Sequence, residues 1–197
     1  NIRPRDIVTL KALENAATVV SATGGSTNAA LHLPAIAHEA GIKFDLFDVA
    51  KIFEKTPYIA DLKPGGKYVA KDMFEAGGIP LLMKTLLDHG YLHGDCLTVT
   101  GRTIAENLAS VKWNPHQDVV RSADNPITPT GGVVGLAGNL AEDGAIVKVA
   151  GMKNLKFTGP ARCFDGEEAC FEAVTNRAYK EGEVLVIRYE GPKGGPG

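Results

Sequence analysis

The sequence has little of several features that mark whole classes of protein. Its 197 residues include three cysteines, three methionines and one tryptophan, and 21 Lys+Arg nearly balance 23 Asp+Glu for a net charge of −2. Such a small net charge provides no electrostatic attraction for nucleic acid or an anionic membrane. The longest apolar runs, such as residues 79–82, fall far short of the roughly 20 residues of a membrane-spanning helix. We therefore expect neither nucleic acid nor membrane as a partner.

The three cysteines, Cys96, Cys163 and Cys170, indicate a reducing compartment. Their number is odd, and the spacing of the last two matches neither a zinc site nor a disulfide framework. We expect three reduced, buried thiols in a cytoplasmic protein. His89 and His93 are four residues apart, but Gly90 ends the helix between them, so we predict no metal site there.

Glycine is the residue in excess. It accounts for 23 of 197 positions, roughly 12% against a typical ~7%. The rest of the composition, 44% hydrophobic and 22% charged, is that of a globular protein with one large domain or two small ones. The glycines gather in clusters, and these clusters are where we look for function.

Apolar residues at helical spacing predict a mainly helical first part of the chain. Ser26 or Thr27 is placed to cap the second helix, Pro34 predicts a short or kinked first turn in it, and Gly41 ends it. The predicted helices cover residues 5–20, 29–40, 46–55, 69–76, 79–89 and 104–111.

The pattern changes between residues 112 and 132, where proline and glycine replace apolar periodicity. Beyond this stretch, strands are predicted at 133–137 and 145–149, joined by a hairpin-like connection over 138–144, with a further strand beginning at Phe157. Asp165 is predicted to cap a helix over 166–177, which leads to a strand over 183–189. We therefore divide the chain into residues 1–113, a linker or domain crossing at 114–130, and a β-rich part at 131–197.

Two glycine clusters are candidate ligand sites. In Ser21–Ala29, two glycines precede Ser26, Thr27 and Asn28 at a helix start, where exposed backbone N–H groups can bind a carboxylate or phosphate. An ordinary tight turn with a helix cap is the alternative. His32 either points back toward this loop or lies in the core or an interface.

The second cluster follows the last predicted strand, where Glu190 and Lys193 flank a glycine-proline loop that resembles a catalytic rim. A solvent loop with an ion pair of no functional role is the alternative. The glycines of the third cluster, at 131–138, are expected to serve tight turns and close strand packing.

The sequence resembles the family of dihydroxy-acid and sugar-acid dehydratases almost from end to end. Within it, Ala29 after Gly-Gly-Ser-Thr-Asn favours the branched-chain amino-acid members, since the phosphogluconate members are expected to carry histidine there. The segments that carry the resemblance keep the family's order: 24–33, 35–41, 74–78, 98–101, 131–132, 138–141, 159–162 and 187–197.

The resemblance implies a cytoplasmic homodimeric lyase of α/β fold class. Its C-terminal part of an α/β domain would be followed by the start of a β-barrel-like swivelling β/β/α domain. The enzyme would dehydrate 2,3-dihydroxy-3-methyl acids to 2-oxo acids in valine and isoleucine biosynthesis. An iron–sulfur cluster, [2Fe-2S] or [4Fe-4S], would act as Lewis acid, Mg²⁺ would hold the substrate, and a serine would take the C2 proton.

The resemblance also implies that the chain is a catalytically incomplete internal fragment, cut at both ends. The family's three cluster cysteines and its Cys-Asp-Lys metal motif would lie upstream of Asn1. Its Met-Pro-Glu-Met motif and catalytic serine would lie beyond Gly197. We therefore assign no catalytic or metal-binding residue here, and assign substrate contact to Ser26, Thr27, Asn28, Glu190 and Lys193. The alternatives are a sugar-acid (aldonate or phosphogluconate) dehydratase and a non-enzymatic binding or interaction module.

Overall fold

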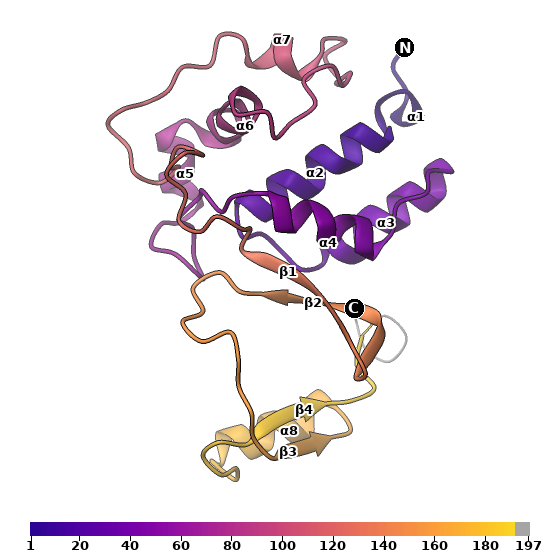
Figure 1. Cartoon of the computed structure of the whole chain (residues 1–197), viewed down its shortest axis with the longest axis vertical. Helices are drawn as coiled ribbons and strands as arrows, with labels where there is room; N and C mark the ends of the chain where they lie inside the picture. Colours follow the sequence, from indigo (N-terminus) through magenta and orange to yellow (C-terminus); the bar gives the residue numbers. More distant parts are fainter. Residues whose placement is uncertain (192–197) are drawn as a thin grey trace. The chain divides into compact units, whose positions relative to one another are not determined.

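The protein folds into two compact units, Asn1–Met152 and Lys153–Gly197. The structure, a computed structural model, describes residues 1–191 (Figure 1). No helix within that range is long and apolar enough to cross a lipid bilayer.

The first unit is mainly helical, as the apolar spacing predicts. The predicted single helix over 5–20 is wrong, because the chain breaks at Val8 and Thr9 and the Thr9 hydroxyl accepts the Ala12 N–H at 3.2 Å, which starts a new helix. The other predicted helices are confirmed, although the last one is shorter than expected. The helices of this unit are α1 (Pro4–Ile7), α2 (Leu10–Ala22), α3 (Ala29–Ala40), α4 (Leu46–Lys55), α5 (Ala70–Ala76), α6 (Gly78–Asp88) and α7 (Ile104–Leu108).

Helix α2 lies at the centre of this unit and packs against α3 and α4 (Figure 1). Its two faces join two apolar cores: Leu13 and Ala17 pack with Phe53 of α4, and Ala22 packs with the α6 side chains. Ala17 and Ala22 are fully buried. The C-terminal end of α2 is therefore held firmly where the glycine loop begins.

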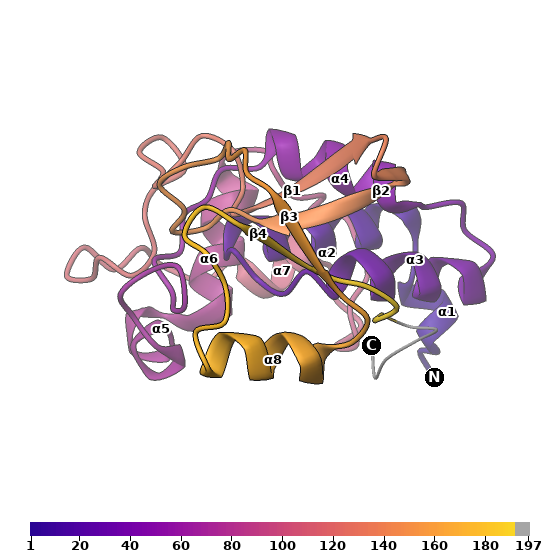
Figure 2. The same ribbon diagram turned by 90° about the horizontal axis from the view of Figure 1, so that it is seen from below.

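A hairpin completes the first unit and lies against α4 (Figure 2). Strands β1 (Val133–Gly138) and β2 (Ala141–Lys148) are antiparallel, with Val133 opposite Lys148. The predicted long connection over 138–144 is wrong, because pairing resumes at Ala141 after a register shift near Gly138. The register places the end of β2 beside the start of β1.

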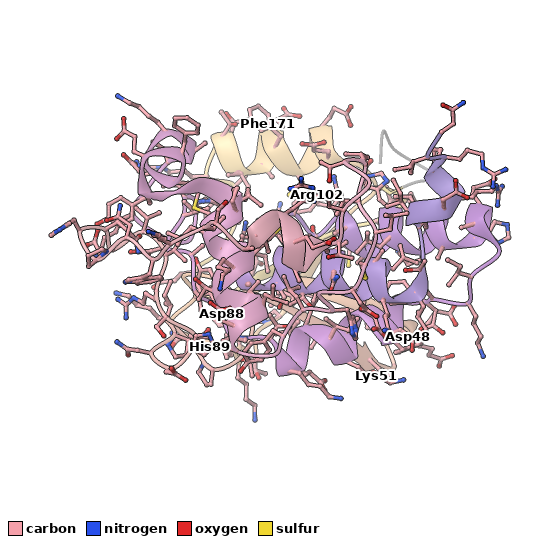
Figure 3. The ribbon with its side chains drawn as sticks, turned by 90° about the horizontal axis from the view of Figure 1, so that it is seen from above. Asp48, Lys51, Asp88, His89, Arg102 and Phe171 are labelled. Atoms are coloured by element: carbon pink, nitrogen blue, oxygen red, sulfur yellow. The ribbon has the colours of Figure 1, made fainter. Side chains whose placement is uncertain are left out.

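In the second unit, β3 (Ala161–Phe164) and β4 (Val184–Ile187) pair in parallel, and α8 (Glu167–Thr175) connects them. The predicted strand start at Phe157 is wrong, since the strand begins at Ala161. Asp165 does not cap α8; its carboxylate accepts the Arg188 Nε–H at 2.7 Å instead. Phe171 projects from α8 with 70% of its surface exposed (Figure 3).

The strands that the structure describes form two sheets of two strands each. Sheets this small do not distinguish between fold classes. The expected α/β class with a β-barrel-like swivelling domain, and the domain limits at residues 113 and 131, therefore stay predictions.

Candidate functional site

The glycine loop begins where α2 ends. Gly24 adopts a left-handed conformation (φ +56°), and its N–H donates to the Ser21 carbonyl at 3.1 Å. A Cβ on Gly24 would lie 3.0 Å from Tyr58 Cε2, so both backbone conformation and space require glycine here. The Gly25 N–H donates to the Val20 carbonyl at 2.9 Å. These two bonds turn the chain sharply away from the α2 axis.

Ser26 and Thr27 form the turn that leads into α3. The Ser26 hydroxyl accepts the Asn28 N–H at 3.2 Å, while the N-cap Asn28 makes no side-chain cap bond. The prediction that Ser26 or Thr27 caps α3 is therefore wrong. Within residues 1–191, the backbone N–H groups of Ser26 and Thr27 have no hydrogen-bond acceptor in the protein. These two donors are free for a ligand.

A cavity of about 470 Å³ opens beside this loop. Two of the predicted contact residues, Ser26 and Thr27, belong to its lining, whereas Asn28 does not. The lining residues are Thr23, Gly24, Gly25, Ser26, Thr27, Leu62, Lys63 and Lys148.

Two lysines reach the cavity from distant parts of the sequence. Lys63 begins a tight loop in which its N–H donates to the Tyr68 carbonyl at 2.8 Å. Lys148 is the last residue of β2 and is half-buried. Among the described residues, neither ammonium group has a carboxylate within 4.0 Å, whereas the neighbouring Lys67 lies 4.0 Å from Asp61. The cavity therefore carries positive charge that the protein does not neutralise locally.

A buried phenol lies directly behind the loop. Tyr58 is 3% exposed, and its hydroxyl has no hydrogen-bond partner among the described residues. Burial raises the pKa of this phenol, and the nearby Asp61 carboxylate raises it further. The ring carbon that carries the hydroxyl would lie 3.4 Å from a Cβ on Gly24. Gly24 is thus both a lining residue of the cavity and the residue against which the phenol packs.

The second predicted rim belongs to the other unit. The Glu190 carboxylate accepts the Glu167 N–H at 2.9 Å, at the first residue of α8. This contact gives Glu190 a structural role at a helix N-terminus, where negative charge is favourable. Lys193 lies outside the described residues. A catalytic rim at Glu190 and Lys193 stays a prediction.

The cysteines and histidines are dispersed. Cys96 and Cys170 are buried as expected, but Cys163 is exposed because alternate side chains of β3 face solvent. His89, at the end of α6 (Figure 3), bonds the Thr85 carbonyl, and His93 bonds Glu14. In the part of the chain that the structure describes, no three His, Cys, Asp or Glu side chains are grouped to hold a metal ion.

His32 is exposed and lies away from the glycine loop. It lines a different groove, of about 520 Å³, between α1 and α3, together with residues such as Pro4 and Ile36. The predicted direction toward the loop is wrong, and so is a position in the core; a position in an interface stays a prediction.

Sequence reasoning missed Lys63, Lys148 and Tyr58. One local signal was available, because Lys63-Pro-Gly-Gly-Lys67 repeats the mixture of glycine and charge seen in the other candidate loops. Nothing local marks Lys148 or Tyr58.

Comparison with known proteins matches the whole chain. A family model described as "Dihydroxy-acid/6-phosphogluconate dehydratase N-terminal" covers residues 1–107, and its C-terminal counterpart covers residues 118–197. The chain is 88% identical over its full length to dihydroxy-acid dehydratase 2 of Mesorhizobium japonicum and 74% identical to dihydroxy-acid dehydratase of Parvibaculum lavamentivorans. It covers 34% of each of these relatives, so it spans about a third of their length. The chain belongs to the dihydroxy-acid/6-phosphogluconate dehydratase family.

Proposed function

We propose that this chain is part of a dihydroxy-acid dehydratase, a hydro-lyase that converts 2,3-dihydroxy-3-methyl acids to 2-oxo acids in valine and isoleucine biosynthesis. The observation that carries the proposal is the full-length match to relatives of that name at 88% and 74% identity. The family model also names 6-phosphogluconate dehydratase. A sugar-acid substrate is therefore the outcome against which the proposal is tested.

Within the complete enzyme, the cavity beside Gly24 forms one wall of the substrate site. Ser26 and Thr27 offer free backbone N–H groups, and the two lysines add positive charge. A 2,3-dihydroxy acid carries one carboxylate and two hydroxyl groups, so it matches a wall of hydrogen-bond donors and cations. Asn28, Glu190 and Lys193 are further proposed substrate contacts.

The proposed activity implies an iron–sulfur cluster and Mg²⁺. When bound, an iron with an open position would supply Lewis acidity toward the leaving hydroxyl. The described residues do not fit either group, because they contain no cluster of suitable ligands. We propose that the ligands lie outside these 197 residues, and we assign no step through either group to this chain.

We also propose that the complete enzyme works as a homodimer in the cytoplasm. The free cysteines are consistent with a reducing compartment.

Turnover by the complete protein tests the proposal. The purified protein is supplied in parallel with 2,3-dihydroxy-3-methylbutanoate, gluconate and 6-phosphogluconate, and the 2-oxo acid is trapped and quantified. We expect the highest kcat/KM for the branched-chain dihydroxy acid. A higher kcat/KM for either sugar acid would move the enzyme to the other branch of the family. No turnover of any of the three by a cofactor-loaded preparation would refute the activity.

A further inference from the structure

We propose that the groove between α1 and α3 is a docking surface of the complete protein, covered by an apolar segment of the same polypeptide that lies outside these 197 residues. The groove has a volume of about 520 Å³ and shares no lining residue with the cavity beside the glycine loop (Figure 2). Pro4 and Val8 line it on the α1 side, and Ala35, Ile36 and Ala40 line it on the α3 side.

Helix α3 is apolar on two faces. One face, with Ala30, Leu33 and Ala37, is buried in the first unit. The groove face carries Ala35 and Ile36, which are exposed, Ile36 by 45% of its surface. A helix that is apolar all round is normally buried inside a larger protein or a membrane. With 12 residues, α3 is too short to cross a membrane, so its second face requires a protein cover.

Helix α4 of the same unit shows the contrasting pattern of a helix that faces solvent. It buries Val49 and Phe53, and its exposed positions include Lys51 and Glu54. In α3 the polar side chains are two histidines and one glutamate. The groove face of α3 therefore lacks the charge with which a neighbouring helix meets water.

The length of the relatives points to the occupant of the groove. The chain covers 34% of relatives to which it is 88% and 74% identical, so most of such a polypeptide lies outside these residues. The remaining part is tethered to the groove by the chain itself. Tethering gives it an effective concentration that a second copy in dilute solution does not reach. A segment of the same chain is therefore favoured over a second copy.

Charged residues beside the apolar surface indicate the chemistry of the covering segment. Arg5 and Glu39 line the groove, and among residues 1–191 neither forms an ion pair. Opposite charges on the two sides of a contact favour the correct partner and its register. We therefore expect apolar side chains toward Ile36, an acidic residue near Arg5 and a basic residue near Glu39. His32 lies on the same face and would belong to this contact.

Cysteine labelling of the complete protein measures whether the face is covered. Ala35→Cys places a thiol in the groove, and His38→Cys places one at an exposed position of the same helix that does not line the groove. Mass spectrometry of the labelled peptides separates these thiols from native ones such as the exposed Cys163. A covered thiol reacts only when its cover opens, so maleimide should label Ala35→Cys at least about tenfold more slowly than His38→Cys.

Photo-crosslinking of the complete protein identifies what covers the face. The photoreactive residue p-benzoylphenylalanine replaces Ile36, and the same replacement of His38 is the control. Denaturing electrophoresis separates adducts within one chain, which keep the monomer mass, from adducts between two chains. From position 36 we expect an adduct of monomer mass, joined to an apolar peptide outside residues 1–197 that contains an acidic and a basic residue. Position 38 should not capture this peptide.

Three outcomes overturn the proposal. A smaller difference in labelling rate between Ala35→Cys and His38→Cys shows that the groove face is open to solvent. An adduct between two chains shows that a second copy covers the face. An adduct confined to residues 1–197, or no adduct at all, shows that no outside segment contacts Ile36. None of these measurements depends on turnover, so a failure of the proposed function is detected separately.

Discussion

Replacement of Gly132 by alanine should destabilise the protein through a backbone collision. A Cβ at this buried position would lie 2.8 Å from Gly24 Cα and 2.9 Å from Ala150 Cβ. Neither neighbour can move away by rotating a side chain, so the main chain itself has to shift. Gly132 does not have positive φ, so the backbone conformation adds no penalty.

The expected magnitude is the difference between two effects. Overpacking in a rigid site costs about 1–3 kcal/mol, and a contact with backbone belongs to the upper part of that range. Replacing glycine restricts the unfolded chain and offsets about 0.4–1 kcal/mol of the cost. The net destabilisation of Gly132→Ala is therefore about 1–2.5 kcal/mol, which lowers the Tm of a domain of this size by roughly 3–8 °C.

Gly138, the last residue of the strand β1 that follows Gly132, is the matched control. It is exposed, its φ is not positive, and a Cβ there would have no atom within 4 Å. Only the effect on the unfolded chain remains, so Gly138→Ala should raise stability by about 0.4–1 kcal/mol. The two substitutions are chemically identical, and the expected difference between them comes from the contact with Gly24.

Thermal unfolding of the two variants, followed by far-UV circular dichroism, measures this difference. The reasoning is refuted if Gly132→Ala melts at or above the temperature of Gly138→Ala, since the contact between Gly132 and the glycine loop would then not be tight.

Two further predictions concern charged groups. The Thr85 carbonyl and, more weakly, the Asp124 carboxylate raise the pKa of His89. The stability that protonated His89 adds to the fold is therefore fully present below the unfolded pKa of about 6.5, and it disappears as the pH rises through the higher folded value. The Tm loss in His89→Ala should thus be larger near pH 5.5 than near pH 8.5, and an equal loss would contradict the assignment. Glu190→Ala should speed hydrogen exchange of the Glu167 amide, while Glu190→Gln, which retains an acceptor, should speed it less; unchanged exchange would exclude the capping contact.

The helices of the first unit were predictable because local features determine them. Helix α4 has apolar residues at helical spacing and an N-cap, Asp45, whose carboxylate accepts the Phe47 and Asp48 N–H groups. Gly41 ends α3 in a left-handed conformation, as expected from its position. Each signal lies within a few residues of the structure that it determines.

The errors arose where a distant partner decides the local structure. The hairpin turn is shorter than predicted because β1 pairing extends β2 back to Ala141, through residues whose own pattern resembles a loop. Asp165 resembles a helix cap in sequence, but its carboxylate accepts from Arg188, the residue after β4, and the Glu190 carboxylate accepts from the first α8 amide. Neither partner lies within residues 160–170, so the sequence of that segment alone could not predict these contacts.

The candidate site likewise has one part that the local sequence predicts and one part that only the fold brings together. Ser26 and Thr27 were predictable because glycine, small polar residues and a helix start occur together in one segment. Lys63 and Lys148 are ordinary surface lysines by sequence, and only the fold places them at one cavity. The positive charge of the cavity thus depends on the tertiary structure, whereas the glycine loop that lines the cavity can be recognised from the sequence.

The glycine clusters were assigned separate roles, ligand binding for one and strand packing for another, and the structure joins these roles at one point. Gly132 packs on Gly24, and Gly65, two residues after Lys63, packs on Ala150, two residues after Lys148. Close packing between backbones therefore fixes the spacing of the three segments that line the cavity. A side chain at either contact would move a lysine or an amide relative to the others by a distance comparable to a hydrogen bond's tolerance. For this reason, a side chain added at Gly132 or Gly65 should disturb the proposed site as much as one added at a glycine that lines the cavity.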